Sequence, residues 1–364
     1  LKAAVLAAKE NSDLPVFATV TLDEKGKMLT GGNVESVTAL LEGLGADVIG
    51  LNCGLGPIQL LPFMRDMAKV SSTPILVNPN AGLPRSVDGK TIYDVGPEEF
   101  ASLMREIAGE GARILGGCCG TTPEYIRQMI AATSDMTPLP LTEKIDTVVS
   151  SYTHGVRVGD RTILIGERIN PTGKKKLKEA LKKHDIAYIL NEGLKQADQG
   201  ADVLDVNVGL PGIDEAEVMQ EAVKELQAVT DLPLQIDTSS PQVLERAIRI
   251  YNGKPLINSV NGKEESMEQV LPLAARYGGV LIALTLDEQG IPMDAQGRVD
   301  IAKKIMERAA AYGIAKKDII VDPLAMTVSS DPSSAMVTLE AIRRIRQELG
   351  MHTSLGVSKV SFGL

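Results

Sequence analysis

The chain has 364 residues, of which 44% are hydrophobic and 23% charged, a composition typical of globular proteins with room for two domains. The net charge of −9, the absence of tryptophan and the scarcity of aromatic residues argue against a nucleic-acid partner. Three cysteines are too few for a disulfide framework, and there is no apolar run long enough for a membrane span, so we expect a cytoplasmic protein without a membrane partner.

The first region, residues 1–131, alternates short apolar runs with amphipathic segments that end at glycine, a common helix stop. Continuously apolar strands that are separated by helices indicate a parallel sheet. Strands are predicted over residues 15–22, 46–54, 73–82 and 112–120.

Residues 132–160 are polar and contain proline, which predicts a linker. The alternation then resumes over residues 161–364. Strands are predicted there over residues 162–170, 201–209, 232–239, 255–262, 278–286, 318–328 and 353–363.

The repeat length predicts the α/β class, with two (β/α)8 TIM-type barrels in tandem. The first would lack its N-terminal half and the second its last unit. A doubly wound sheet is the alternative, but no Gly-x-Gly-x-x-Gly follows the first strand of either region. Because the chain opens inside a helical pattern and stops inside a strand pattern, we expect it to be a piece of a longer protein.

The three cysteines lie at predicted strand ends. Cys53 ends the second strand, and the adjacent Cys118 and Cys119 end the fourth. Carboxyl ends of barrel strands share one rim, so the thiols can meet there. Three thiolates favour zinc over Mg²⁺ or Ca²⁺ and leave one tetrahedral position open, as in catalytic sites. Alternatively, Cys53 is a small buried hydrophobic residue and the pair is incidental or forms a strained vicinal disulfide.

The stretches "LNCGLGP", "NPNAGLP" and "GGCCGTTPEYI" resemble the homocysteine-binding, zinc-dependent methyltransferase domain, and the match extends to about Met129. The resemblance implies that Cys53, Cys118 and Cys119 are zinc ligands. It also implies that the thiolate of homocysteine occupies the open position.

Carboxylates and amides gather at the predicted strand ends of the second region. A ring of such groups without histidine or cysteine suits a heterocycle with several N–H donors, such as a pterin, whose edge a carboxylate can bind with two hydrogen bonds. The set comprises Glu167, Asn170, Asp205, Asn207, Asp237, Asn258, Asn261 and Asp322. Asn258 and Asp322 could instead be ordinary turn residues.

Two of these carboxylates have a structural alternative. Asp237 could cap the following helix, but Ser240, directly before a proline, is the better cap. Asp205 lies within an apolar strand and needs a partner there, for which Arg168 is a candidate.

The stretches "GERIN", "LDVNVG", "IDTS", "DPL" and "LGVSKVSFGL" resemble the pterin-binding domain shared by dihydropteroate synthases and methyltetrahydrofolate methyltransferases. The resemblance implies that the pterin ring is held by Asp237, Asn258 and Asp322, with Glu167 and Asn207 close by. Lys359 stands where the methyltransferases usually have an asparagine close to pterin N5. Lys359 is therefore predicted to be catalytic, in the proton transfer or hydrogen bonding at N5.

Together the two regions resemble the cobalamin-dependent methionine synthases. That family implies transfer of the methyl group of 5-methyltetrahydrofolate by way of cobalamin to zinc-activated homocysteine, which yields methionine and tetrahydrofolate. The chain has no Asp-x-His-x-x-Gly cobalamin motif, so we expect cobalamin on a domain outside this chain or on a separate corrinoid protein. The alternatives are a methyltetrahydrofolate–corrinoid protein methyltransferase of one-carbon metabolism, a dihydropteroate synthase, in which the cysteine pair has no role, and a non-catalytic pterin-binding fragment.

Overall fold

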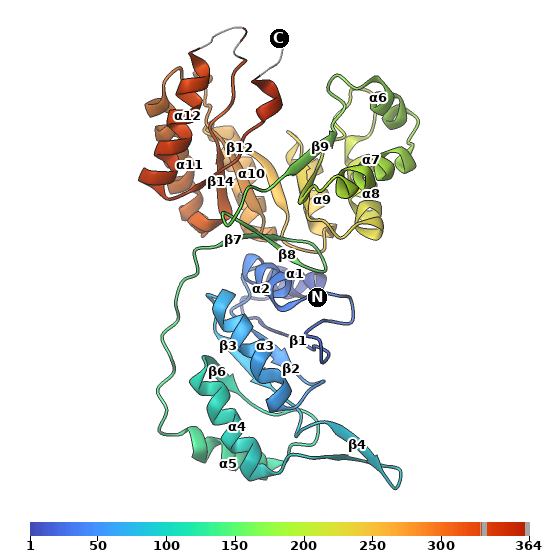
Figure 1. The fold of residues 1–364 in the computed structure, drawn as a ribbon, viewed down its shortest axis with the longest axis vertical. Helices are drawn as coiled ribbons and strands as arrows, with labels where there is room; N and C mark the ends of the chain where they lie inside the picture. The colour runs from blue at the N-terminus through green and yellow to red at the C-terminus, as the bar shows by residue number, and fades with distance from the viewer. Residues whose placement is uncertain (328, 330–332, 361–364) are drawn as a thin grey trace. The chain divides into compact units, whose positions relative to one another are not determined.

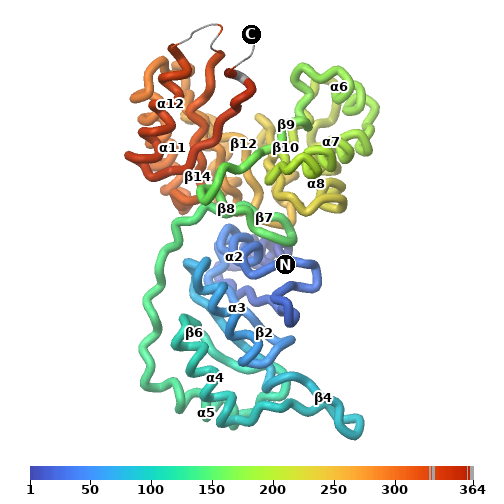
Figure 2. Tube along the Cα trace, in the orientation of Figure 1, coloured from blue at the N-terminus to red at the C-terminus, as the bar shows by residue number. Residues whose placement is uncertain are grey.

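A computed structural model describes residues 1–327, 329 and 333–360, apart from the side chain of Lys359. The chain divides into two compact units (Figures 1 and 2). The first unit consists of residues 1–144 and 152–155, and the second of residues 145–151 and 156–364.

The first unit is built on a parallel sheet of four strands in the order β1-β2-β3-β6, and helices α2, α3 and α4 pack against its strands (Figure 1). A two-stranded antiparallel hairpin, β4–β5, is inserted between β3 and α4. The elements are α1 (Lys2–Asn11), β1 (Phe17–Val20), α2 (Val34–Gly43), β2 (Val48–Asn52), α3 (Pro57–Val70), β3 (Ile75–Asn78), β4 (Pro84–Val87), β5 (Lys90–Tyr93), α4 (Pro97–Gly109), β6 (Ala112–Leu115) and α5 (Pro123–Thr133).

Local signals set the helix starts in this unit. Asn33 and Ser36 form a capping box at α2, in which each side chain accepts a hydrogen bond from the backbone N–H of the other. Helices α3, α4 and α5 each begin with a proline, whose missing N–H costs nothing in the first turn. Each of these helices comes after a strand of the sheet, so the connecting loops gather at the carboxyl edge of the sheet.

The second unit is built on a parallel sheet of seven strands in the order β15-β14-β13-β12-β11-β10-β9. Helices pack against the outer side of successive strands (Figure 1). The elements are β7 (Thr147–Ser150), β8 (Gly155–Val158), β9 (Ile165–Ile169), α6 (Lys175–Lys182), α7 (Ile186–Asp198), β10 (Val203–Val206), α8 (Glu215–Val229), β11 (Leu234–Asp237), α9 (Pro241–Ile250), β12 (Leu256–Asn261), α10 (Glu264–Tyr277), β13 (Val280–Leu284), α11 (Ala295–Ala311), η1 (Lys316–Asp318), β14 (Ile319–Asp322), α12 (Ser334–Arg344), η2 (Ile345–Leu349), β15 (His352–Thr353) and η3 (Val357–Lys359).

Strands β7 and β8 lie across the amino ends of this sheet (Figures 1 and 2). Val149 of β7 is fully buried among the first residues of the sheet strands, such as Val203 and Val280, and Val156 and Val158 of β8 pack against the same cluster. The backbone of Ser150 in β7 is held by hydrogen bonds to residues 251 and 254. The amino end of the second sheet is therefore filled by apolar side chains.

The predicted α/β class with two parallel sheets is confirmed, and every predicted strand overlaps an observed one. The last predicted strand, residues 353–363, is shorter than expected, because β15 covers only His352–Thr353. Its neighbour β14 ends at Asp322. The pairing of the two strands therefore extends only as far as the hydrogen bond from the N–H of Ser354 to the carbonyl of Val321. The hairpin β4–β5 was not predicted. Strands β7 and β8 lie within the region predicted as a linker and were not predicted either.

Asp237 does not cap helix α9. Ser240 does so, by accepting a hydrogen bond from the backbone N–H of Val243, as predicted. Within residues 1–327 and 333–360, none of the helices combines the length and the apolar composition that crossing a bilayer requires.

Candidate functional site

Three thiols meet at the carboxyl edge of the first sheet. Cys53 directly follows β2, and Cys118 and Cys119 follow β6. The Cys119 sulfur lies 3.6 Å from that of Cys53 and 3.9 Å from that of Cys118, and all three sulfurs lie within 4.8 Å of one another. A tetrahedral zinc ion with Zn–S bonds of about 2.3 Å separates its sulfur ligands by about 3.8 Å. The spacing and the donor type therefore fit zinc.

The segment that follows β3 holds the loops that carry the cysteines. Cys53, in the left-handed backbone region at φ 56°, donates its N–H to the carbonyl of Asn78 at 2.9 Å. The buried side chain of Asn80 accepts a hydrogen bond from the N–H of Cys119 at 3.2 Å. Asn80 was not among the predicted site residues, although it lies within the stretch "NPNAGLP" that carries the family resemblance.

The thiols influence one another electrostatically. Burial, together with the neighbouring Cys53, raises the pKa of the Cys118 thiol to about 11. Burial also opposes ionisation of Cys53, but hydrogen bonds from the Gly54 backbone and from the other two thiols leave its pKa below the usual value. Ionising neighbouring thiols together places like charges beside one another, which a cation bound between them would offset.

A fourth titratable side chain lies beside this cluster. The ring of Tyr93, the last residue of β5, packs against Gly120, the residue after the cysteine pair. Burial and the charge of the three cysteines raise the pKa of its hydroxyl. Tyr93 was not predicted from the sequence, because it lies in a hairpin that has no apolar pattern.

The interior of the second sheet is layered. Because side chains alternate along a strand, Val203, Asp205 and Asn207 point to the same side. The strand register places Gln235 opposite Asp205, and Asn258 opposite Asp237. Polar side chains thus lie above the apolar layer that β7 and β8 cover, toward the carboxyl ends of the strands.

The predicted pterin residues lie at this polar edge. Asn207 directly follows β10, and Asp237 and Asn258 lie on the neighbouring strands β11 and β12. The amide of Asn207 donates to Asp237 Oδ2 at 3.0 Å. Glu167 lies on β9, beside β10, and is exposed. Asp322 ends β14, two strands beyond Asn258. The side chain of Lys359 lies outside the described part of the chain, so its predicted catalytic role stays a prediction.

Arg298, which was not predicted, shapes the loop after Asp322. Its side chain is 1% exposed, and Nη1 donates to the carbonyls of Pro323 and Leu324, each at 2.9 Å, and to Oγ1 of Thr338 at 3.0 Å. Asp322 itself accepts a hydrogen bond from the N–H of Leu324 at 2.8 Å. The buried guanidinium therefore fixes the turn that directs the chain away from this strand end.

Asp205 lies beneath the pterin residues and is 1% exposed. Its hydrogen-bond donor is the amide of Gln235, not the predicted Arg168, whose side chain is exposed. Among the described residues, no group hydrogen-bonds to its second oxygen. Burial and the nearby charge of Asp237 raise the pKa of Asp205 well above 3.8, outweighing the hydrogen bond from Gln235. A buried carboxylate without a cation is unfavourable, so Asp205 keeps its proton to a higher pH than an exposed aspartate does.

This protonation predicts a pH effect on stability. The folded state keeps a proton on Asp205 that the unfolded chain releases near pH 3.8, so the stability contributed by Asp205 is lost as the pH rises toward its folded-state pKa. Asp205→Asn keeps the hydrogen bond but cannot ionise. We expect this variant to gain stability relative to the wild type between pH 4 and pH 8 in urea unfolding.

Asp202 provides the control for this measurement. It is paired with Arg161, whose hydrogen bond lowers the pKa of Asp202, so its stabilising contribution is present above pH 3.8 and lost below its folded-state pKa. Between pH 4 and pH 8, Asp202→Asn should therefore be less stable than the wild type by a margin that does not change with pH. Equal pH slopes for the wild type and Asp205→Asn would contradict the protonation of Asp205.

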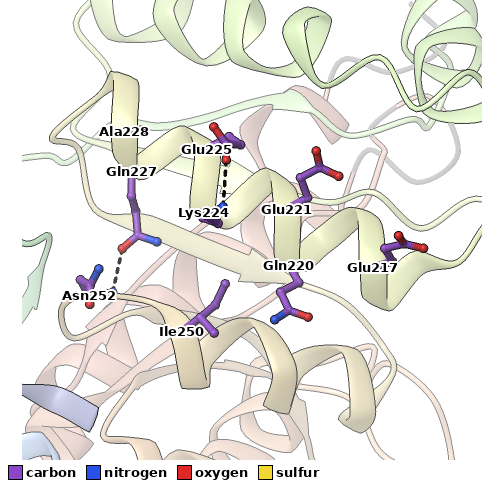
Figure 3. Close-up of a pocket in the computed structure, with 9 residues that line it drawn as sticks. All are labelled: Glu217, Gln220, Glu221, Lys224, Glu225, Gln227, Ala228, Ile250 and Asn252. Carbon is purple, nitrogen blue, oxygen red and sulfur yellow. Dashed lines mark hydrogen bonds and ion pairs between the residues drawn. The ribbon is translucent and has the colours of Figure 1, made fainter. Parts of the chain in front are cut away.

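A pocket of about 520 Å³ lies between helices α8 and α9 on the outside of the second sheet (Figure 3). It contains none of the predicted site residues. Its lining includes three glutamates and one lysine, and comprises Glu217, Gln220, Glu221, Lys224, Glu225, Gln227, Ala228, Ile250 and Asn252.

Two family models match separate parts of the chain. The sequence model of the family described as "Pterin binding enzyme" matches residues 166–364, and that of "Homocysteine S-methyltransferase" matches residues 1–133. The chain belongs to the pterin-binding enzyme family. Its first unit additionally carries the homocysteine S-methyltransferase match, which agrees with the resemblance seen in the cysteine motifs.

Curated relatives match the whole chain. The methionine synthase of Mycobacterium tuberculosis is 33% identical over 383 residues, and that of Mycobacterium leprae is 32% identical over 388 residues. Each alignment covers 100% of this chain and 32% of the relative, so the chain spans about a third of the length of these relatives. The expected similarity to methionine synthases is confirmed.

Solved structures also resemble part of the chain. A dihydropteroate synthase from Stenotrophomonas maltophilia is 24% identical with a TM-score of 0.44, over 57% of this chain and 76% of that protein. A dihydropteroate synthase from Xanthomonas albilineans is 22% identical with a TM-score of 0.44, over 58% of this chain and 77% of that protein.

Proposed function

We propose that this chain is a methyltransferase that provides the two substrate sites for methionine synthesis from homocysteine and 5-methyltetrahydrofolate. The observation that carries the proposal is the set of three thiols with the sulfur spacing of a zinc site, in a unit that matches homocysteine S-methyltransferases. The pterin-binding match of the second unit supports the methyl donor. The three free cysteines also suit a reducing, cytoplasmic compartment.

In the first unit Cys53, Cys118 and Cys119 would hold Zn²⁺, leaving the fourth position for the sulfur of homocysteine. Bound there, the ion would lower the pKa of the substrate thiol, which is otherwise mostly protonated at neutral pH. The hydrogen bond from Cys119 to Asn80 keeps the backbone of the cysteine pair in place. These residues bind and orient the acceptor.

In the second unit the carboxylate of Asp237 would accept hydrogen bonds from the N–H groups of the pterin edge. The amide of Asn207 orients that carboxylate, and Asn258 lies next to it on β12. Glu167 and Asp322 would complete the rim on either side. The pKa of the buried Asp205 beneath them is raised by burial and by the charge of Asp237, which disfavours a second negative charge at the floor of the site.

Overall, the bond from N5 to the methyl carbon breaks and the bond from that carbon to the homocysteine sulfur forms. N5 gains one proton and the thiol loses one, so the reaction is balanced without another reactant. We propose that Lys359 supplies or stabilises the proton at N5. The chain has no recognisable cobalamin motif, so the methyl carrier, cobalamin, would be held by another domain or a separate corrinoid protein.

The two half-reactions test this proposal separately. Zinc-loaded protein is mixed with homocysteine and free methylcobalamin, and methionine formation is followed. In a second assay it is mixed with cob(I)alamin and 5-methyltetrahydrofolate, and methylcobalamin formation is followed. We expect both reactions. If only the second reaction occurs, the chain is a methyltetrahydrofolate–corrinoid methyltransferase. If neither reaction occurs, the proposed methyltransferase function is contradicted.

A further inference from the structure

Leu324, two residues after the end of β14, has a left-handed backbone with a φ of 64°. A residue other than glycine rarely adopts this conformation, and it persists only where the surroundings hold it. Backbone strain of this kind gathers at functional sites. Because the turn directly follows Asp322, a predicted pterin residue, the groups that hold Leu324 can also affect that carboxylate.

The left-handed turn directs a backbone donor at the carboxylate of Asp322. The N–H of Leu324 donates to Asp322 Oδ1 at 2.8 Å. The backbone of Asp322 is held separately, since its carbonyl accepts a hydrogen bond of 3.1 Å from the N–H of Thr285, the residue after β13. The sheet therefore fixes where Asp322 lies, and the turn fixes the direction of its carboxylate.

Two buried side chains hold the carbonyl of Leu324. Arg298 of α11 is 1% exposed, and its Nη1 donates to this carbonyl at 2.9 Å. Thr338 of α12 is 4% exposed, and its Oγ1 donates to the same carbonyl at 3.1 Å. Arg298 Nη1 also donates to Thr338 Oγ1 at 3.0 Å, so the three groups form a closed set between two adjacent helices (Figure 1).

A buried guanidinium is a costly way to fill this space. Within the described residues its hydrogen bonds go to neutral acceptors, namely the carbonyls of Pro292, Pro323 and Leu324 and the hydroxyl of Thr338. The cost of removing the charge from water is therefore not offset by a hydrogen-bonded carboxylate. An uncharged side chain would pack at lower cost but could not hold the carbonyls of the turn, which favours a functional reason for Arg298.

We propose that Arg298 and Thr338 are positioning residues of the pterin site, which hold the carboxylate of Asp322 through the left-handed turn at Leu324. Both act through this turn rather than through contact with the substrate. A carboxylate that is already in place loses less conformational freedom when a ligand binds, so the ligand binds more tightly. This inference rests on the proposed role of Asp322 in pterin binding.

Two variants test the hold on the turn. Thr338→Val keeps the shape of the side chain and removes only the hydroxyl. Its matched control is Thr38→Val, because both threonines are buried in a helix and donate to the carbonyl four residues earlier, but only Thr338 also donates to Leu324. The second variant, Arg298→Lys, keeps the positive charge but lacks the fixed fork of donors that a guanidinium has.

Two quantities are measured for each protein, the hydrogen-exchange rate of the Leu324 N–H by NMR and the affinity for 5-methyltetrahydrofolate by calorimetry. We expect Thr338→Val and Arg298→Lys to exchange faster at Leu324 and to bind the folate about 5- to 10-fold more weakly, as for one lost hydrogen bond. In an Asp322→Ala background neither change should weaken folate binding further, because its effect passes through that carboxylate. Thr38→Val should match the wild type.

Wild-type exchange and wild-type folate affinity in both variants would overturn the inference. Affinity losses that add to that of Asp322→Ala would also overturn it, since they indicate a general effect on the unit, as would wild-type affinity in Asp322→Ala itself. If the wild type binds no 5-methyltetrahydrofolate, the proposed function falls and exchange at Leu324 decides alone. Faster exchange in both variants then keeps the hold on Asp322, and unchanged exchange refutes it.

Discussion

Replacing Cys119 with serine is expected to reduce bound zinc from about one ion per chain to nearly none. The hydroxyl of serine does not ionise at neutral pH and is a poor ligand for a borderline-soft ion. Structural zinc sites with four ligands bind with about 10–16 kcal/mol, so one lost ligand costs about 3 kcal/mol, or more than 100-fold in affinity. Metal analysis after dialysis, with chelator titration, measures the loss.

The chelated wild type is the matched control for this variant, because it lacks the metal but keeps every side chain. Cys119→Ser should resemble it in methionine formation from methylcobalamin and in thermal unfolding, since Cys119 is exposed and contributes little to the core. Cys53→Ser and Cys118→Ser should lose zinc in the same way. A wild type without zinc, or a Cys119→Ser variant that retains it, would refute the assignment of these ligands.

Replacing Asp237 with asparagine is expected to weaken the binding of 5-methyltetrahydrofolate by about 3 kcal/mol, or roughly 100-fold, since a hydrogen bond to a charged group contributes about 1.5–3 kcal/mol. The amide presents an N–H where the carboxylate accepts, so a pterin donor would face another donor. The amide of Asn207 donates to Oδ2 of Asp237 in the wild type. The asparagine side chain of the variant offers this amide one acceptor oxygen instead of two. Titration calorimetry with the folate measures the effect.

Asp202→Asn is the control for this measurement, because Asp202 is paired with Arg161 and is not among the predicted pterin residues. It should bind the folate as tightly as the wild type does. Folate binding by Asp237→Asn with wild-type affinity would show that the pterin lies elsewhere, and the second unit would then need a different ligand. Zinc binding should not change in either variant.

Much of the fold is predictable because parallel strands are buried on both faces. Runs such as residues 201–209 and 278–286 are almost continuously apolar. Short apolar runs of this kind between helical patterns are typical of buried parallel strands. The strands that escaped prediction lack this signal. Strand β7 has four residues with polar ends, and hairpin β4–β5 is exposed, so neither leaves an apolar run in the sequence.

The candidate site was predictable where it depends on strand ends. The meeting of Cys53 with the cysteine pair follows from the common rim of parallel strands, as does the proximity of Asp237 and Asn258. Contacts made by an inserted segment were not predictable, because Tyr93 lies beside the cysteine loop only through the path of a hairpin. The partner of Asp205 was predicted wrongly, since strand register, which sequence does not reveal, places Gln235 opposite it.

The apolar cluster that β7 and β8 form at the amino end of the second sheet also limits the side from which the proposed methyl carrier could reach that sheet. One end of the second sheet is closed by Val149 and its neighbours, so a bulky cofactor can reach the pterin residues only from the carboxyl end. The thiols of the first unit likewise lie beyond the carboxyl ends of their strands. Under the proposed function, a carrier that serves both sites would therefore approach each of them at the carboxyl ends of its strands.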